Sequence, residues 1–117
     1  MGRMAKMKGI RGELQVRDLC RENGFTSVQR GGQAMFQRGS EIADVVGLPG
    51  IHIECKNVER LNYRQAMEQS IRDCEQEGAG NLPILAHKSN RKPWLITMRA
   101  SDWFKLYKGY RASLWPF

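Results

Sequence analysis

The chain is poor in the residues that build disulfide-stapled and zinc-binding domains. Its three cysteines, Cys20, Cys55 and Cys74, are odd in number and far apart, and no C-x-x-C pair occurs. This pattern argues against a disulfide framework and against a zinc knuckle. His52 and His87 do not have the spacing of zinc ligands, so we expect them to be structural or surface residues.

Long hydrophobic runs and acidic residues are also scarce. No run of about twenty apolar residues occurs, and the N-terminus lacks the apolar core of a signal peptide. The sequence therefore predicts a cytoplasmic protein that does not enter a membrane. Only 12 Asp and Glu residues stand against 19 Lys and Arg residues, which gives a formal net charge of +7. Such an excess favours an anionic partner, and nucleic acid is the leading candidate.

The length of 117 residues predicts one domain that spans residues 1–117. Hydrophobic periodicity and turn residues predict a mixed α/β order, α-β-β-β-α-β-β-α. The predicted segments are a helix over 8–23, a strand over 25–29, a second strand that begins near Ala34, a turn at 38–41, a hairpin of 42–46 with 51–56, a helix over 62–77, strands at 83–87 and 94–98, and a short helix capped by Ser101.

The hairpin is the most informative segment, because it carries two acids and a lysine. The alternation of apolar and polar residues over 51–56 places His52, Glu54 and Lys56 on one face of the strand. Its partner strand can then bring Asp44 beside Glu54. Two adjacent carboxylates repel each other unless a cation lies between them, which indicates a site for a hard metal ion. The alternative is a hairpin whose polar face is simply solvated.

A third carboxylate, Glu13, lies within the apolar stripe of the first predicted helix. An acid at such a position is costly to bury unless another group compensates its charge. The alternative is a glutamate at the edge of an amphipathic helix. On the second long helix, Gln65 and Gln69 lie where either side chain could point at the polar surface of the hairpin.

The order Glu13, Asp44, Glu54-x-Lys56, followed by a helix and further strands, resembles the PD-(D/E)xK nuclease superfamily. In size and element order the chain is similar to small archaeal and phage-type Holliday junction resolvases and to VRR-NUC modules. The resemblance spans residues 8–98 and implies a restriction-endonuclease-like core, with a mixed central sheet flanked by helices. Ala43 stands where the superfamily motif has proline.

The resemblance also implies roles for individual residues. Asp44, Glu54 and the main-chain carbonyl of Cys55 would bind the metal, and Glu13 would join them directly, through water or at a second metal. Lys56 would orient the attacking water or neutralise developing charge, and Gln69 matches the helix glutamine of the VRR-NUC modules. Because the ligands are all oxygen atoms, Mg²⁺ is the expected cofactor and Mn²⁺ should substitute for it.

The resemblance implies that the protein cleaves DNA. We expect first that it acts on branched DNA and resolves Holliday junctions. A nickase, a flap or restriction-like nuclease, and a non-catalytic basic binding module remain as alternatives. A small chain of this type fits a phage, prophage or archaeal recombination gene. The residues expected to bind the DNA backbone are Arg11, Arg30, Arg38, Lys88, Arg91 and Lys92.

The C-terminal region from Trp103 to Phe117 is unusually apolar and aromatic for the end of a small domain. Apolar surface of this kind usually marks an interface, so we expect a homodimer. Symmetric cutting of a four-way junction independently requires two active sites related by a two-fold axis. The alternative is that Trp115 and Phe117 fold back over their own sheet.

Overall fold

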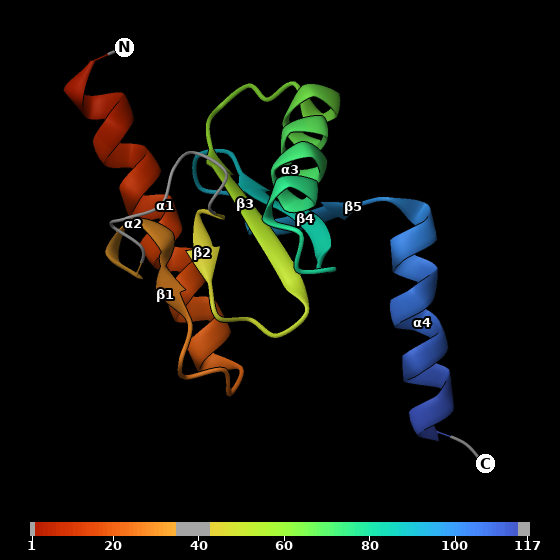
Figure 1. Cartoon of the computed structure of the whole chain (residues 1–117). Coiled ribbons are helices and arrows are strands. Elements are labelled where there is room, and N and C mark those ends of the chain that lie inside the picture. The colour runs from red at the N-terminus through yellow and green to blue at the C-terminus, as the bar shows by residue number, and fades with distance from the viewer. Residues whose placement is uncertain (1, 35–42, 115–117) are drawn as a thin grey trace.

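A computed structural model describes residues 2–34 and 43–114 of the chain (Figure 1). The helices and strands, in chain order, are α1 (Arg3–Glu22), β1 (Gln29–Arg30), α2 (Gly31–Ala34), β2 (Val45–Val46), β3 (Ile51–Asn57), α3 (Tyr63–Glu77), β4 (Leu82–Lys88), β5 (Leu95–Met98) and α4 (Ala100–Leu114). Apart from the short α2, this order is the predicted one. In the described part of the chain, no helix is long and apolar enough to span a membrane.

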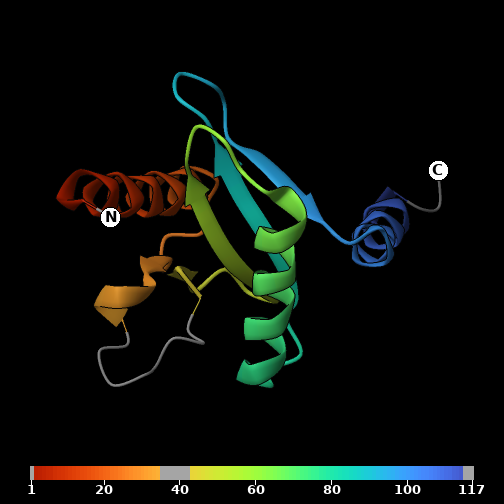
Figure 2. The same ribbon diagram turned by 90° about the horizontal axis from the view of Figure 1, so that it is seen from above.

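The five strands form one mixed sheet in the order β1-β2-β3-β4-β5. The central pair, β3 and β4, is parallel, and α3 is the crossover between these two strands. The other three pairings are antiparallel, including the predicted hairpin of β4 and β5. Helices α1 and α3 lie on different sides of the sheet (Figure 2). The predicted α/β class, with a mixed sheet flanked by helices, is confirmed.

The core has two parts, because alternate residues of the central strands point to opposite faces of the sheet. On the face covered by α1, Val16 of the helix packs with Ile53 and Cys55 of β3. On the face covered by α3, Ala66 and Met67 pack against Leu85 of β4. Both faces of β3 are therefore covered, and its polar residues on the α3 face lie in a buried environment.

Glycine permits the close approach of α1 to the sheet. A side chain at Gly12 would place its Cβ only 2.7 Å from the Cβ of Asn57 and 3.3 Å from the ring of Trp94. Only a residue without a Cβ lets the helix backbone approach β3 this closely. Because Glu13 is the next residue, this contact also sets the distance between Glu13 and the strands.

Helix α3 begins and ends as the sequence predicts. The side chain of Asn62 accepts a hydrogen bond from the backbone N–H of Gln65 at 3.0 Å and caps the first turn. Gly78 ends the helix with φ 69°, in the left-handed conformation that glycine adopts most easily.

Two predicted strand boundaries before the hairpin were wrong. Residues 25–28 form a turn closed by the bond from Val28 N–H to the Phe25 carbonyl, so the first strand contains only β1. Ala34 lies in α2 and does not begin a strand. The chain turns at Gly31, whose N–H donates to the Asp44 carbonyl at 2.8 Å and whose Cβ, if it had one, would overlap the carbonyl oxygen of Ala43. The rest of the strand predicted near Ala34, and the turn at 38–41, lie outside the described residues.

The final helix also differs from its prediction. Ser101 is the second residue of α4 and not its cap, because the first turn bonds to the Arg99 carbonyl. The helix continues to Leu114 and stands away from the rest of the molecule (Figure 1). Near its start, the buried carboxylate of Asp102 accepts a hydrogen bond from Arg99 Nε at 2.8 Å. Trp115 and Phe117 lie outside the described residues.

Candidate functional site

The antiparallel pairing of β2 and β3 brings the two hairpin acids face to face. Val45 is the register partner of Ile53, so Asp44 lies opposite Glu54. The backbone N–H of Asp44 donates to the Ile53 carbonyl at 3.0 Å. The Asp44 carboxylate in turn accepts a hydrogen bond from the backbone N–H of Cys55 at 2.8 Å. These two bonds fix the Asp44 side chain beside the strand that carries Glu54 and Lys56.

The Asp44 carboxylate is held in an unfavourable electrostatic environment. Burial, followed by the charge of Glu54, raises the pKa of Asp44 to about 7, although the Cys55 N–H bond opposes the shift. The charge of Glu13 adds to the increase, and that of Lys56 reduces it. Glu54 is only 4% exposed, and its Oε1 is buried without a hydrogen-bond partner among the described residues. The site therefore concentrates negative charge that the described side chains only partly compensate.

Glu13 reaches this region from α1. Its side chain is about four-fifths buried and forms an ion pair with Arg30 Nη1 at 3.2 Å. Its charge acts on both Asp44 and Cys55. The structure thus brings Glu13 toward the hairpin acids and away from bulk solvent, with Arg30 as its counter-ion.

Lys56 is half-buried and contributes the positive charge of the cluster, since it lowers the pKa of Asp44. In the described ranges it forms no ion pair of its own. The thiol of Cys55 is buried in the core on the α1 face, and burial together with the charge of Asp44 raises its pKa. Such a thiol is a poor nucleophile, so the backbone of Cys55 is the part of this residue that can serve the site.

These groups fit a hard divalent cation. Two carboxylates approach each other in a buried region, one of their oxygens lacks a partner, and the pKa of Asp44 is raised by the charge of Glu54. A cation bound between them would relieve the repulsion and satisfy the unpartnered oxygen. Asp44 and Glu54 are the residues that would hold it.

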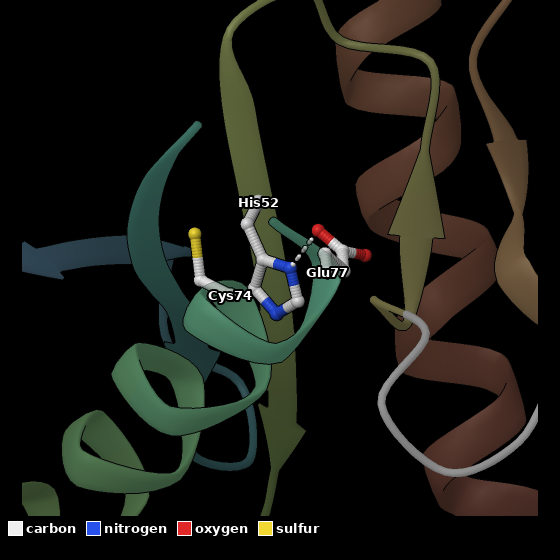
Figure 3. Close-up of side chains that lie close together, drawn as sticks. All are labelled: His52, Cys74 and Glu77. Atoms are coloured by element: carbon white, nitrogen blue, oxygen red, sulfur yellow. Dashed lines mark hydrogen bonds and ion pairs between the residues drawn. The ribbon is translucent and has the colours of Figure 1, made fainter. Parts of the chain in front are cut away.

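A second polar cluster adjoins the acids on the α3 face (Figure 3). The buried His52 shares a hydrogen bond between its Nδ1 and Glu77 Oε1 at 2.8 Å, and its Nε2 lies 3.8 Å from Glu54 Oε1. Burial opposes protonation of His52, but the nearby carboxylates of Glu54 and Glu77 outweigh burial and raise its pKa. The ligand atoms of His52, Cys74 and Glu77 lie within 4.8 Å of one another.

The sequence did not single out Glu77, although it carries a usable signal. Glu77 is the last residue of α3, where the helix dipole disfavours a negative charge. An acid at this position is costly unless a neighbouring group stabilises it, and here His52 does so. His52 is 1% exposed, so it is a buried residue of the polar cluster and not a surface histidine.

Several cations line a groove at the carboxyl-terminal ends of β3 and β4. The lining residues are Lys8, Arg11, Gln15, Asn57, Glu59, Lys88, Asn90 and Arg91. Arg91 has φ 61°, a conformation that non-glycine residues rarely adopt and that often occurs at functional positions. Asn57 donates from Nδ2 to the Lys8 carbonyl at 3.1 Å, and its Oδ1 is buried without a partner in the described structure.

The other predicted site residues have different positions. Lys92 lines a neighbouring pocket together with Lys88. Arg30 pairs with Glu13 at the acidic cluster, and Arg38 lies outside the described residues. Gln69 is half-buried on α3, and its side chain makes no hydrogen bond within residues 2–34 and 43–114. The groove thus brings together Arg11, Lys88 and Arg91, and its lining includes Asn57, the residue after Lys56.

The mixed sheet, the facing acids Asp44 and Glu54, the neighbouring lysine and the helix acid are features of a nuclease of the PD-(D/E)xK class. A family model described as "Phage putative PDDEXK endonuclease" matches residues 4–115, which is nearly the whole chain. The protein belongs to this phage PDDEXK endonuclease family. No curated protein matches the chain.

Proposed function

We propose that the protein is a Mg²⁺-dependent DNA endonuclease that resolves Holliday junctions as a homodimer, with Mn²⁺ able to replace Mg²⁺. The observation that carries the catalytic part is the placement of Asp44 opposite Glu54, with the unpartnered Glu54 oxygen and Lys56 on the same strand. Asp44, Glu54 and the Cys55 carbonyl would hold the metal, and a bound metal would supply polarisation of the phosphate and acidification of a water molecule.

The remaining residues of the cluster act on charge and position. Lys56 has no ion pair among the described residues, so its ammonium group is available to orient a water or to neutralise charge that develops on the phosphate. Arg30 forms an ion pair with Glu13 and partly neutralises its charge. Glu13 can therefore lie near the phosphate without repelling it with a full negative charge. Gln69 is a further candidate for the site.

The basic groove supports binding of the DNA backbone. Arg11, Lys88 and Arg91 lie along it, and its wall includes Asn57, next in sequence to Lys56. A strand whose phosphates follow these cations would pass the end of β3, the strand that carries Glu54 and Lys56. Contacts to phosphates position DNA without reading its sequence, as a nuclease selective for DNA structure requires. Arg38 and Lys92 are proposed to extend this contact.

The exposed face of α4 supports a dimer. Trp103, Tyr107, Tyr110 and Leu114 are spaced by four, three and four residues, which is the pattern of a helix-pairing seam. All four are 38–59% exposed, and the rings of Trp103 and Tyr107 stack at 5.3 Å. The cations Lys105 and Lys108 fall outside this seam. A second copy of α4 is therefore the partner that matches the face, and an isologous pair would give two active sites related by a two-fold axis.

A panel of labelled DNA substrates tests the proposal. The purified chain is incubated with Mg²⁺ and four-way junction, flap, nicked, linear duplex or single-stranded DNA, and the products are resolved on denaturing gels. We expect paired, symmetric incisions in the junction and at least about tenfold slower cutting of linear duplex. Equal cutting of all substrates would contradict junction selectivity, and no cutting with either Mg²⁺ or Mn²⁺ would contradict the nuclease chemistry.

The groove gives a separate prediction about DNA binding. Arg11→Gln combined with Arg91→Gln should weaken junction binding at 100 mM salt, because two phosphate contacts are lost. The slope of log affinity against log salt should fall by about two. Electrophoretic mobility shifts in Ca²⁺ at several salt concentrations measure both quantities. Lys6→Gln, an exposed residue of α1 outside the groove lining, is the matched control. An unchanged slope in the double variant would show that the groove does not bind DNA.

A further inference from the structure

We infer that His52 is a positioning residue that holds the Glu54 carboxylate through the chain Glu77–His52–Glu54. This inference rests on the proposed function, because it assigns Glu54 as a metal ligand. His52 and Glu54 are two residues apart on β3, so both side chains project from the same face of the strand. Their side chains are 0% and 5% exposed, which leaves little room for solvent to take the place of either partner.

Each nitrogen of the His52 ring faces a carboxylate oxygen. Nδ1 lies 2.8 Å from Glu77 Oε1, a full hydrogen bond, and Nε2 lies 3.8 Å from Glu54 Oε1. Both Nε2 and Glu54 Oε1 are buried without another partner in the described part of the chain. Leaving two such groups unpaired is costly, and with the ring protonated on both nitrogens each is the natural partner of the other. A small movement of Glu54 toward His52 would complete the bond and fix the second carboxylate oxygen for the metal.

Glu77 anchors the other end of this chain. Its Oε1 bonds to His52, and its Oε2 accepts from the backbone N–H of Ala43 at 3.4 Å. Ala43 directly precedes Asp44. The last residue of α3 therefore contacts both strands that carry the hairpin acids, β3 through His52 and the start of β2 through Ala43. Partners of this kind typically fix the orientation of metal-binding carboxylates.

The same side chains do not suit a zinc site of their own. Cys74 and Glu77 lie on opposite sides of His52 in the view of Figure 3. The Cys74 thiol donates to the Asn81 carbonyl at 3.1 Å, and burial raises its pKa, which opposes the thiolate form that zinc requires. The hydrogen bond between His52 and Glu77 occupies Nδ1 of His52, the ring nitrogen that would have to bind a metal shared with Glu77.

Two substitutions separate the two contacts of the ring. The amide of His52→Asn can occupy the position of Nδ1 and keep the bond to Glu77. The amide of His52→Gln can occupy the position of Nε2 and keep a donor facing Glu54. Mn²⁺ affinity is measured by electron paramagnetic resonance on the full chain without DNA, alongside kcat, KM and thermal stability. We expect His52→Gln to bind Mn²⁺ within about threefold of the wild type, and His52→Asn to lose about 10- to 100-fold in affinity, with a matching loss in kcat and little change in KM.

A purely structural role for His52 predicts a different order. If His52→Asn binds Mn²⁺ as tightly as His52→Gln, or if neither differs from the wild type, the positioning role is overturned. Zinc bound stoichiometrically to the purified protein and lost in Cys74→Ser would also overturn it. If neither His52 variant folds, Glu77→Gln decides: weaker Mn²⁺ binding than in Glu75→Gln, an exposed control on the same helix, supports the role, and equal binding overturns it. A wild type that binds Mn²⁺ but cuts no DNA would refute the proposed function, while the affinity order would still test His52.

Discussion

Asp44→Asn and Glu54→Gln should each abolish DNA cleavage, with a loss of at least about 10³-fold in kcat. Each change removes a carboxylate from the pair that binds the metal, and metal-assisted charge stabilisation contributes several kcal/mol to such reactions. DNA binding should be unchanged or tighter, because a negative charge that repels phosphate is lost. Single-turnover cleavage and mobility shifts in Ca²⁺ measure the two effects separately. Cleavage at a near wild-type rate by either variant would refute the assignment.

The stability of Asp44→Asn provides the control against misfolding. The folded pKa of Asp44, about 7, is above its ordinary value of 3.8, so the folded state favours the protonated form. The ionised group therefore destabilises the metal-free protein. This cost is absent below about pH 3.8, grows as the pH rises and is complete above pH 7. Asparagine keeps an oxygen for the Cys55 N–H and carries no charge. In EDTA, Asp44→Asn should thus melt at a higher temperature than the wild type at pH 8, with a smaller difference at pH 5.

Lys56→Ala separates the lysine from the metal ligands. It should be as inactive as the carboxylate variants, because no other ammonium group of the described structure takes part in this cluster. It should still bind Mn²⁺, since it removes a positive charge beside the acids. Loss of Mn²⁺ binding in Lys56→Ala would show that the lysine organises the site itself.

The second large effect concerns oligomeric state. Trp103→Lys combined with Tyr107→Lys should convert a dimer of about twice the 13.4 kDa chain mass into a monomer. Both rings lie on the proposed seam of α4, and two charges there cannot be buried against a second copy without a large cost. Because both side chains are exposed in the single chain, the monomer itself should keep its melting temperature. Sedimentation equilibrium at micromolar concentration measures the mass.

Lys108→Gln, on α4 but outside the seam, is the matched control and should remain dimeric. The monomeric variant should lose paired junction incision more than single nicking, because each chain retains its own acidic cluster. A wild type that is monomeric at micromolar concentration and still cuts junctions in pairs would contradict the dimer.

The sequence predicted the elements that depend on local patterns. Alternation of polar and apolar residues over 51–56 predicted β3, and apolar residues at helical spacing over 62–77 predicted α3. The segment between α1 and the hairpin was predicted less well. Its backbone follows a contact between Gly31 and the Asp44 region, which are far apart in sequence, so no local pattern encodes it. The position of α4 also depends on tertiary packing. The sequence therefore showed an excess of apolar residues in this region but did not show that the helix stands away from the sheet.

The sequence by itself determined where the proposed catalytic groups lie: Asp44, Glu54 and Lys56 fall within 13 consecutive residues of one hairpin, and strand pairing with alternation brings them to one region. Only the tertiary structure decided what surrounds them. Packing of α1 through Gly12 brings Glu13 to the hairpin acids, the pairing of β1 with β2 brings Arg30 there, and the end of α3 brings Glu77 to His52. The pKa of Asp44 and the unpartnered oxygen of Glu54 are consequences of burial between two helices. Burial and long-range contacts depend on how the elements pack, so they cannot be predicted from the spacing of residues along the chain.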